Sequence, residues 1–133
     1  GLYHAHSLTN STGEKSGIIH RDISPQNILV SYRGDVKIID WGIAKSDIKL
    51  DKTVVGTIKG KFGYMSPEQA NGETLTARSD MYSAAVVLWE LLTGRKLFFK
   101  TTTLEIFKRI QEGKIPSPRK YNPKIPLQLE KII

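Results

Sequence analysis

The chain has 133 residues, of which 39% are hydrophobic and 25% are charged, as in a globular domain rather than a disordered segment. Its formal net charge is +7, but the basic residues are scattered, so we expect no nucleic-acid partner. The absence of cysteine excludes disulfides, thiolate metal sites and cysteine nucleophiles. The longest apolar run, 84–89, is too short to cross a bilayer, and we expect no membrane segment within this piece.

The first part of the chain predicts a short helix and a hairpin. Residues 1–8 have the apolar spacing of a helix end, and 9–16 predict a polar loop. Two short β-branched runs, 28–30 and 36–39, flank a turn in which Gly34 can take a positive φ. We therefore expect the two runs to pair as antiparallel strands.

The second part predicts mostly helices. Residues 45–62 form a long polar stretch, and a loop of this length is usually functional or mobile. Residues 67–70 predict a helical turn. Residues 78–93 are apolar nearly all round, which predicts a buried central helix, and Gly94 is its expected C-cap.

Two further helices are expected near the end of the sequence, separated by a stiff connector that contains four prolines. Residues 103–112 predict an amphipathic helix closed by Gly113, and 127–133 begin another. The expected apolar stripe of the helix at 103–112 consists of Leu104, Phe107 and Ile110. The whole pattern favours an α+β fold that is mainly helical.

Three oxygen-bearing side chains lie next to the predicted hairpin. Asp22 and Asn27 precede its first strand, and Asp40 follows the second. If the strands pair, all three lie at one end of the hairpin. Asn and Asp oxygens are hard ligands for Mg²⁺, and a nearby Asp can accept a proton from an attacking hydroxyl. Each residue alone could simply cap a turn or end a strand, but together they indicate phosphoryl transfer.

Three motifs occur in order: His-Arg-Asp-Ile-Ser-Pro-Gln-Asn at 20–27, Asp-Trp-Gly at 40–42 and Ser-Pro-Glu at 66–68. With these motifs the chain resembles the C-terminal lobe of the eukaryotic-type protein kinases, most closely the bacterial serine/threonine members. The resemblance implies that residues 1–133 are a partial kinase catalytic domain. It would run from the end of helix E into the start of helix H, with a short hairpin beside the catalytic loop and the N-terminal lobe absent.

The resemblance also implies the roles of the acidic and amide side chains. Asp22 would be the catalytic base. Asn27 and Asp40 would bind the Mg²⁺ that accompanies ATP, with Mn²⁺ as an alternative ion. Asp80, on the buried helix, would accept hydrogen bonds from the backbone of the catalytic loop, since a buried carboxylate needs such partners.

Other motif residues would have structural roles. His20 and Trp41 would stack in an apolar spine behind the site, and Trp41 stands where the family usually has Phe. Gly42 completes its motif. Glu68 would form an ion pair with an Arg that lies farther along than this chain extends, so we expect it to lack that partner here.

Arg21 is a cation beside the expected base. In similar kinases such an Arg binds a phosphorylated residue between the second and third motifs, and the candidates here are Thr53 and Thr57. The alternative is that both threonines are ordinary loop residues.

Two departures from the family pattern look like an exchange. Ser24 stands where serine/threonine kinases usually have Lys, and Lys61 stands where a Thr usually bonds to the catalytic Asp. We expect Lys61 to reach Asp22 and the transferred phosphate, and Ser24 to supply the hydroxyl, because a point charge on a flexible stem can act from either side. The alternative is that Lys61 is a solvated loop lysine.

The resemblance thus implies transfer of the γ-phosphoryl group of ATP to Ser or Thr of a protein substrate. The location would be cytoplasmic, with any membrane anchor outside this piece. Without the Gly-rich loop and strand Lys of the missing N-terminal lobe, we expect the isolated 133 residues to be inactive. The alternative function is a non-catalytic interaction module, a truncated or pseudokinase lobe.

Overall fold

The computed structural model describes residues 1–9, 11–13, 17–41, 61–99 and 101–133. The helices are α1 (Leu2–His6), α2 (Pro67–Asn71), α3 (Ala77–Thr93), α4 (Thr103–Glu112) and α5 (Leu127–Glu130); the short 3₁₀ turns are η1 (Pro25–Asn27), η2 (Phe62–Tyr64) and η3 (Pro118–Lys120); the strands are β1 (Ile28–Val30) and β2 (Val36–Ile38). The predicted mainly helical composition with one small hairpin is confirmed.

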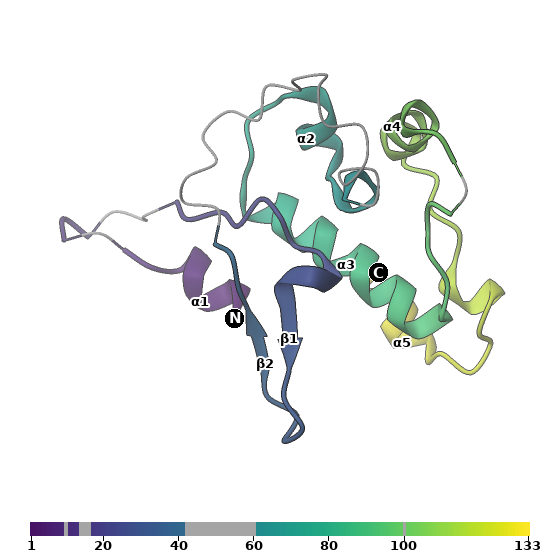
Figure 1. Ribbon diagram of the computed structural model, residues 1–133, viewed down its shortest axis with the longest axis horizontal. Helices are drawn as coiled ribbons and strands as arrows, with labels where there is room; N and C mark the ends of the chain where they lie inside the picture. Colours follow the sequence, from purple (N-terminus) through teal and green to yellow (C-terminus); the bar gives the residue numbers. More distant parts are fainter. Residues whose placement is uncertain (10, 14–16, 42–60, 100) are drawn as a thin grey trace.

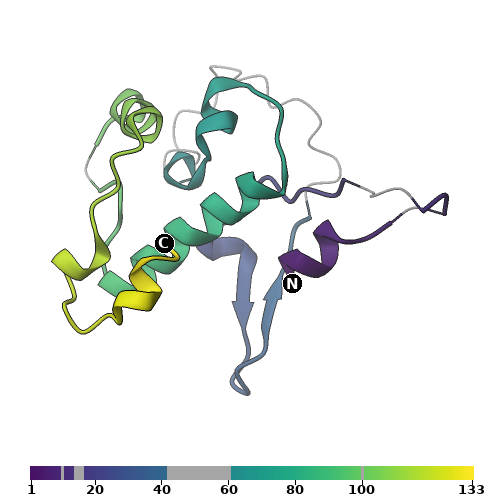
Figure 2. The same cartoon turned by 180° about the vertical axis from the view of Figure 1, so that it is seen from behind.

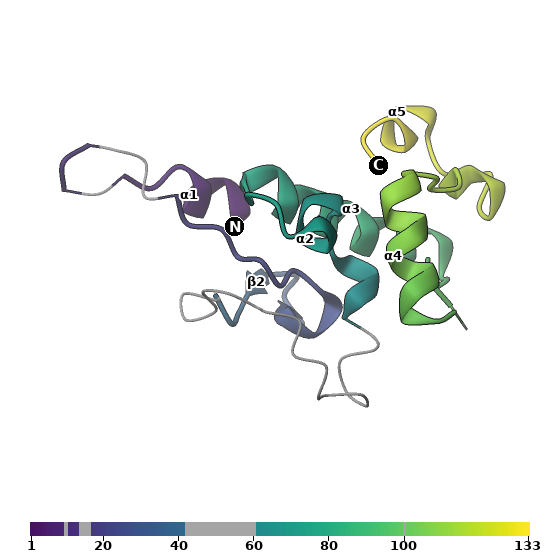
Figure 3. The same cartoon turned by 90° about the horizontal axis from the view of Figure 1, so that it is seen from above.

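Helix α3 crosses the middle of the molecule (Figures 1 and 2). Helix α1 lies near its first residues, and α5 lies near its last residues. Seen from above, α1 and α4 stand at opposite ends of α3 (Figure 3). The two ends of α3 therefore meet different parts of the chain.

Strands β1 and β2 pair antiparallel, as the β-branched runs predict. The paired residues are Ile28 with Ile38, Leu29 with Lys37, and Val30 with Val36. The N–H of Ser31 donates to the carbonyl of Asp35 at 2.9 Å and closes the turn. Gly34 has φ +88° in this turn, a conformation that costs a residue without a Cβ little.

Helices α2, α3 and α4 have strong local start and stop signals. Each begins with a capping box and ends at a Gly in the left-handed conformation. The capping pairs are Ser66 with Gln69, Thr76 with Ser79, and Thr102 with Glu105. The predicted helix ends at Gly94 and Gly113 are confirmed.

Helix α3 buries different kinds of residue along its length. Its first half buries polar side chains, and its second half buries apolar ones. The two sets are Ser79, Asp80 and Ser83, and then Val86, Val87 and Trp89. The prediction of burial nearly all round is wrong for Leu91, which is 76% exposed. The elements packed on α3 cover only part of its circumference, and Leu91 lies on the uncovered part.

The predicted apolar stripe of α4 is also partly wrong. Ile106 and Ile110 are the buried residues, and Leu104 is 78% exposed. At 3.6 residues per turn, Leu104 lies about 120° from the centre of the stripe that Ile106, Phe107 and Ile110 form. Phe107 contacts the ring of Phe62 with ring centroids 5.5 Å apart, which sets the buried side of the helix.

Candidate active site

The loop at 20–27 is held from below by a buried carboxylate on α3. Asp80 is 1% exposed and accepts hydrogen bonds from the backbone N–H groups of His20, at 2.8 Å, and Arg21, at 2.9 Å. These predicted contacts are present. The His6 side chain on α1 adds a third contact, with Nε2 2.8 Å from Asp80. Because a buried carboxylate needs such partners, this side chain ties the loop, α1 and α3 together.

The loop is strained where it meets this carboxylate. Arg21 has φ +67°, which is uncommon for a residue with a large side chain and occurs often at functional sites. The contacts that hold Arg21 in place include the bond from its N–H to Asp80 and the bond from Nε2 of Gln69 to its carbonyl at 2.8 Å. Sequence reasoning missed Gln69, although its place in the Ser66 capping box was visible.

His20 connects the loop to the end of the hairpin. It is fully buried, its Nε2 lies 2.8 Å from the carbonyl of Ile39, and its Nδ1 accepts from the N–H of Asp22 at 3.3 Å. One tautomer satisfies both bonds, with the proton on Nε2. The Trp41 ring meets the His20 ring edge-on at 4.8 Å, so the predicted contact between these rings is present.

The three predicted oxygen-bearing residues lie on neighbouring backbone. The Asn27 side chain donates through Nδ2 to the carbonyl of Asp22 at 2.7 Å. The carbonyl of Asn27 accepts from the N–H of Ile39 at 3.0 Å, and Asp40 follows directly, with φ +59°. The structure thus brings Asp22, Asn27 and Asp40 to the same end of the hairpin, as the spacing predicts.

This donor set fits a magnesium ion that also binds phosphate oxygens. Because Nδ2 of Asn27 is used within the loop, the amide oxygen is the atom that remains for a ligand. The carboxylate of Asp40 is exposed at the same end. Among the described residues no group of three or more His, Cys, Asp or Glu could hold a metal. Mg²⁺ is commonly bound by one or two protein oxygens together with phosphates and water. The amide oxygen of Asn27 and the carboxylate of Asp40 are therefore enough for such an ion.

Lys61 reaches the expected base, as the exchange hypothesis predicts. Its Nζ lies 2.7 Å from Oδ2 of Asp22. The other half of that hypothesis is not met, because the Ser24 hydroxyl is buried without a hydrogen-bond partner among the described residues. Ser24 is 1% exposed and Asp22 only partly buried, so the two side chains lie at different depths.

Glu68 has a partner within α3. Its Oε1 accepts from the Ser79 hydroxyl at 2.6 Å, and within the described ranges it makes no ion pair. Burial raises the pKa of Glu68, but the hydrogen bonds from Ser79, its own backbone N–H and Ser66 together outweigh burial and lower it. The expected absence of an Arg partner therefore does not leave the carboxylate unsatisfied.

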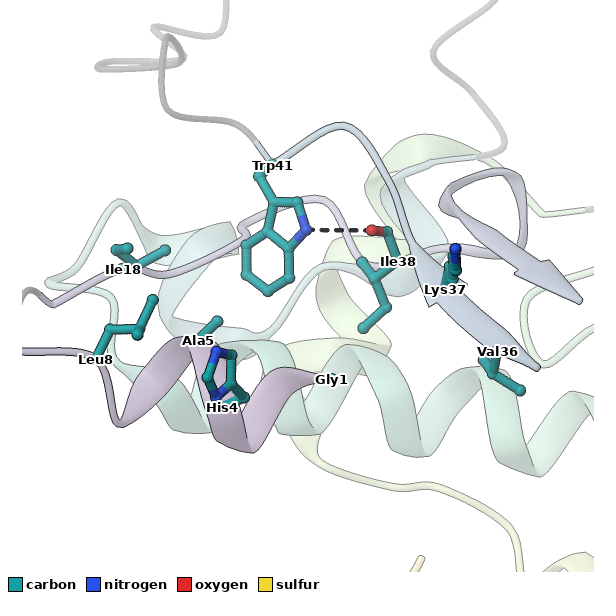
Figure 4. Close-up of a pocket in the computed structure, with 9 residues that line it drawn as sticks. All are labelled: Gly1, His4, Ala5, Leu8, Ile18, Val36, Lys37, Ile38 and Trp41. Atoms are coloured by element: carbon teal, nitrogen blue, oxygen red, sulfur yellow. Dashed lines mark hydrogen bonds between the residues drawn. The ribbon is translucent and has the colours of Figure 1, made fainter.

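A pocket of about 420 Å³ lies beside the site rather than in it. Figure 4 shows the Trp41 indole between β2 and α1, with Nε1 donating to the carbonyl of Ile38. The lining residues are Gly1, His4, Ala5, Leu8, Ile18, Val36, Lys37, Ile38 and Trp41. It includes none of Asp22, Asn27 and Asp40, so it is not where the predicted chemistry lies. Gly42, Thr53 and Thr57 lie outside the described residues.

Comparison with known proteins agrees with this geometry. The model of the protein kinase domain matches residues 1–131, and the chain therefore belongs to the protein kinase family. Its predicted likeness to bacterial serine/threonine kinases is confirmed by the relatives below.

Three relatives illustrate the range of similarity. The tyrosine-protein kinase MasK of Myxococcus xanthus is 40% identical over all 133 residues, which are 21% of that protein. The probable serine/threonine-protein kinase PknB of Lactococcus lactis is 45% identical over 118 residues, 88% of this chain and 19% of the relative. The serine/threonine-protein kinase PrkC of Bacillus subtilis is 40% identical over 116 residues, 87% of this chain and 18% of the relative. The chain thus spans about a fifth of the length of these relatives.

None of the helices in the described part of the chain has the length and apolar character needed to cross a membrane.

Proposed function

We propose that this chain is part of the large lobe of a serine/threonine protein kinase and carries the base and metal ligands of its active site. The proposal rests on two hydrogen bonds. One joins the Asn27 side chain to Asp22, and the other joins the backbone of Asn27 to Ile39, the residue before Asp40. These bonds hold one candidate base and two candidate ligands at one end of the hairpin.

In the proposed reaction Asp22 accepts the proton of a substrate hydroxyl. The hydroxyl oxygen forms the new bond to the γ-phosphorus of ATP, and its proton passes to the Asp22 carboxylate. The bond between the γ-phosphorus and the bridging oxygen breaks, and ADP leaves. Because positioning and charge stabilisation dominate phosphoryl transfer, the strained and anchored loop is well suited to this task.

Asn27 and Asp40 would hold Mg²⁺, or Mn²⁺, against the phosphates. When bound, the ion neutralises the negative charge that the phosphate oxygens carry. The protein's part is to keep an amide oxygen and a carboxylate fixed, which the bond from Asn27 to Asp22 and the constrained backbone of Asp40 accomplish.

The remaining parts of the site would come from an N-terminal lobe. A kinase also needs a Gly-rich loop, a strand Lys and its Glu partner. We therefore propose that the 133 residues alone are inactive, and a radiolabel assay of this chain by itself tests that. Because ATP is the co-substrate, we propose a cytoplasmic location for the kinase region.

The acceptor is proposed to be Ser or Thr in a protein, in line with the names of PknB and PrkC. Tyrosine is the second candidate, because MasK, whose match covers all 133 residues of this chain, is named a tyrosine-protein kinase. Phosphoamino-acid analysis of the labelled product separates the two.

The test uses the full-length protein that contains this chain, with radiolabelled ATP, Mg²⁺ and a protein substrate. We expect transfer by the wild type, none after chelation of the metal, and a loss of at least about 100-fold in kcat for Asp22→Asn. Asp35→Asn, in the exposed hairpin turn, is the matched control and should keep wild-type activity. A wild type that binds partners but transfers no phosphoryl group would instead favour the non-catalytic module.

We further propose that Thr53 or Thr57 becomes phosphorylated and binds near Arg21. A phosphate there would form charge-assisted hydrogen bonds with the guanidinium. Intact-mass and peptide mass spectrometry of the active protein should find phosphate on residues 42–60. Active protein without it would rule this role out.

A further inference from the structure

Side chains of the segment 61–69 contact the loop that carries the candidate base. The ammonium group of Lys61 lies 2.7 Å from the carboxylate of Asp22. Eight residues later, Gln69 donates to the carbonyl of Arg21 at 2.8 Å. The segment therefore contacts two adjacent residues of the loop, one of them the expected base and the other the strained Arg21.

The segment 61–69 is itself fixed to α3. The carbonyl of Tyr64 accepts from the buried Ser83 hydroxyl at 2.6 Å, and its own hydroxyl donates to Glu90 at 2.7 Å. A Cβ on Gly63 would lie 3.3 Å from the ring of Phe98, so the backbone packs closely there. Since Asp80 of α3 also holds the loop, the helix supports both segments and sets their separation.

The ion pair between Lys61 and Asp22 contributes little to the stability of the fold. Lys61 is 40% exposed and Asp22 17%, and exposed ion pairs typically contribute only about 0–1 kcal/mol. Its position beside the candidate base makes a functional role the better explanation. A carboxylate that must approach an anionic phosphoryl group is helped by a nearby cation.

Ser24, which follows Asp22 closely in the sequence, has a neutral side chain. It lies two residues after Asp22, it is buried, and its hydroxyl has no hydrogen-bond partner among the described residues. Because Ser is uncharged, the loop has no cation at position 24. Lys61, which is 39 residues from Asp22 in the sequence, places a cation beside that carboxylate instead.

We propose that Lys61 is a positioning residue through which the docking of the segment 61–69 on α3 makes Asp22 competent for phosphoryl transfer. It holds the carboxylate and supplies a cation from the segment 61–69 instead of from the loop at 20–27. This inference rests on the proposed function.

The experiment measures kcat, KM for the protein substrate and thermal unfolding of full-length variants. Lys61→Met removes the charge and keeps the length of the side chain, and we expect kcat to fall about 10- to 100-fold with a smaller change in KM. Lys61→Arg restores a cation and should retain clearly more of kcat than Lys61→Met. Lys124→Met, on an exposed turn, is the matched control and should behave as the wild type.

The reciprocal exchange gives the sharpest readout. The double variant Ser24→Lys, Lys61→Thr moves the cation into the loop and should recover kcat relative to Lys61→Thr alone. Because Ser24 is buried, this variant could lose stability, in which case the comparison of Lys61→Met with Lys61→Arg decides the question.

The outcomes separate this inference from the proposed function. Undiminished kcat in Lys61→Met, or equal losses in Lys61→Met and Lys61→Arg that follow a lower Tm, overturns the inference while the proposed function stands. A wild-type protein without transfer overturns the proposed function and the inference with it. Loss in Lys61→Met with retention in Lys61→Arg supports the inference.

Discussion

The two halves of α3 carry out different tasks although they belong to one continuous helix. The first half buries the side chains of Ser79, Asp80 and Ser83 under the candidate site, and each of these three has a hydrogen bond to another segment of the chain. The second half buries Val86, Val87 and Trp89 in a core with Tyr64 and Leu97. The polar half therefore orients backbone, while the apolar half supplies the hydrophobic stabilisation that keeps the helix in place.

The comparison predicts the largest effect for Asp80→Asn. This change keeps the shape but replaces one acceptor oxygen by a donor, so one of the N–H groups of His20 and Arg21 loses its partner. We expect unfolding to become easier by about 1–3 kcal/mol. We also expect kcat of the full-length protein to fall about 100-fold, because small misplacements of a catalytic group cost that much. Calorimetry and steady-state kinetics measure the two effects, and a wild-type kcat would contradict the assigned role of this half.

Val86→Ala should lower stability to a similar extent without lowering kcat. It removes buried methyl groups from the apolar half, and we expect a loss of about 2 kcal/mol in the free energy of unfolding. The kcat of the folded protein should not change, because the loop contacts are untouched. Calorimetry with active-site titration tests this; a kcat that falls as far as in Asp80→Asn would remove the distinction between the two halves.

Gln69→Glu sharpens the contribution of the segment 61–69. The carboxylate keeps the acceptor for the N–H of Ser66 but loses the donor to the carbonyl of Arg21. We expect kcat to fall by a factor between about 3 and 10, with little change in Tm. Gln111→Glu, on the exposed face of α4, is the matched control. Equal kinetics in the two variants would show that the contact with Arg21 is dispensable.

The smallest expected effect is a pH dependence from Glu68. Hydrogen bonding lowers the pKa of Glu68 in the folded chain below its ordinary value of 4.5, despite opposition from burial. Ionised Glu68 therefore stabilises the fold fully above pH 4.5, and this contribution disappears as the pH falls through the lowered folded value.

The Tm difference between the wild type and Glu68→Gln should accordingly be constant above pH 4.5 and shrink below it. Thermal unfolding across this range measures the difference. A difference that grows on acidification would mean that the sign of the effect is wrong.

Much of the local structure could be predicted from the sequence. The hairpin and the ends of α3 and α4 at Gly94 and Gly113 followed from short patterns, and the link between Asp80 and the loop was implied by the resemblance to the kinase family. The burial of single apolar residues could not be predicted in the same way. Leu91 and Leu104 are exposed because neighbouring elements cover only part of each helix, and the sequence of a helix does not say which part.

The sequence by itself determined the family motifs, the order of the elements and the chemistry of the side chains near the hairpin. Only the tertiary structure decided between the two interpretations of Lys61, by placing its ammonium group against Asp22, and only it showed that Gln69 holds Arg21 and that the Ser24 hydroxyl is left without a partner in the described chain. The physical reason is distance along the chain. The segments meet because both are bound to α3, and contacts of this kind depend on how separate elements pack rather than on any local propensity.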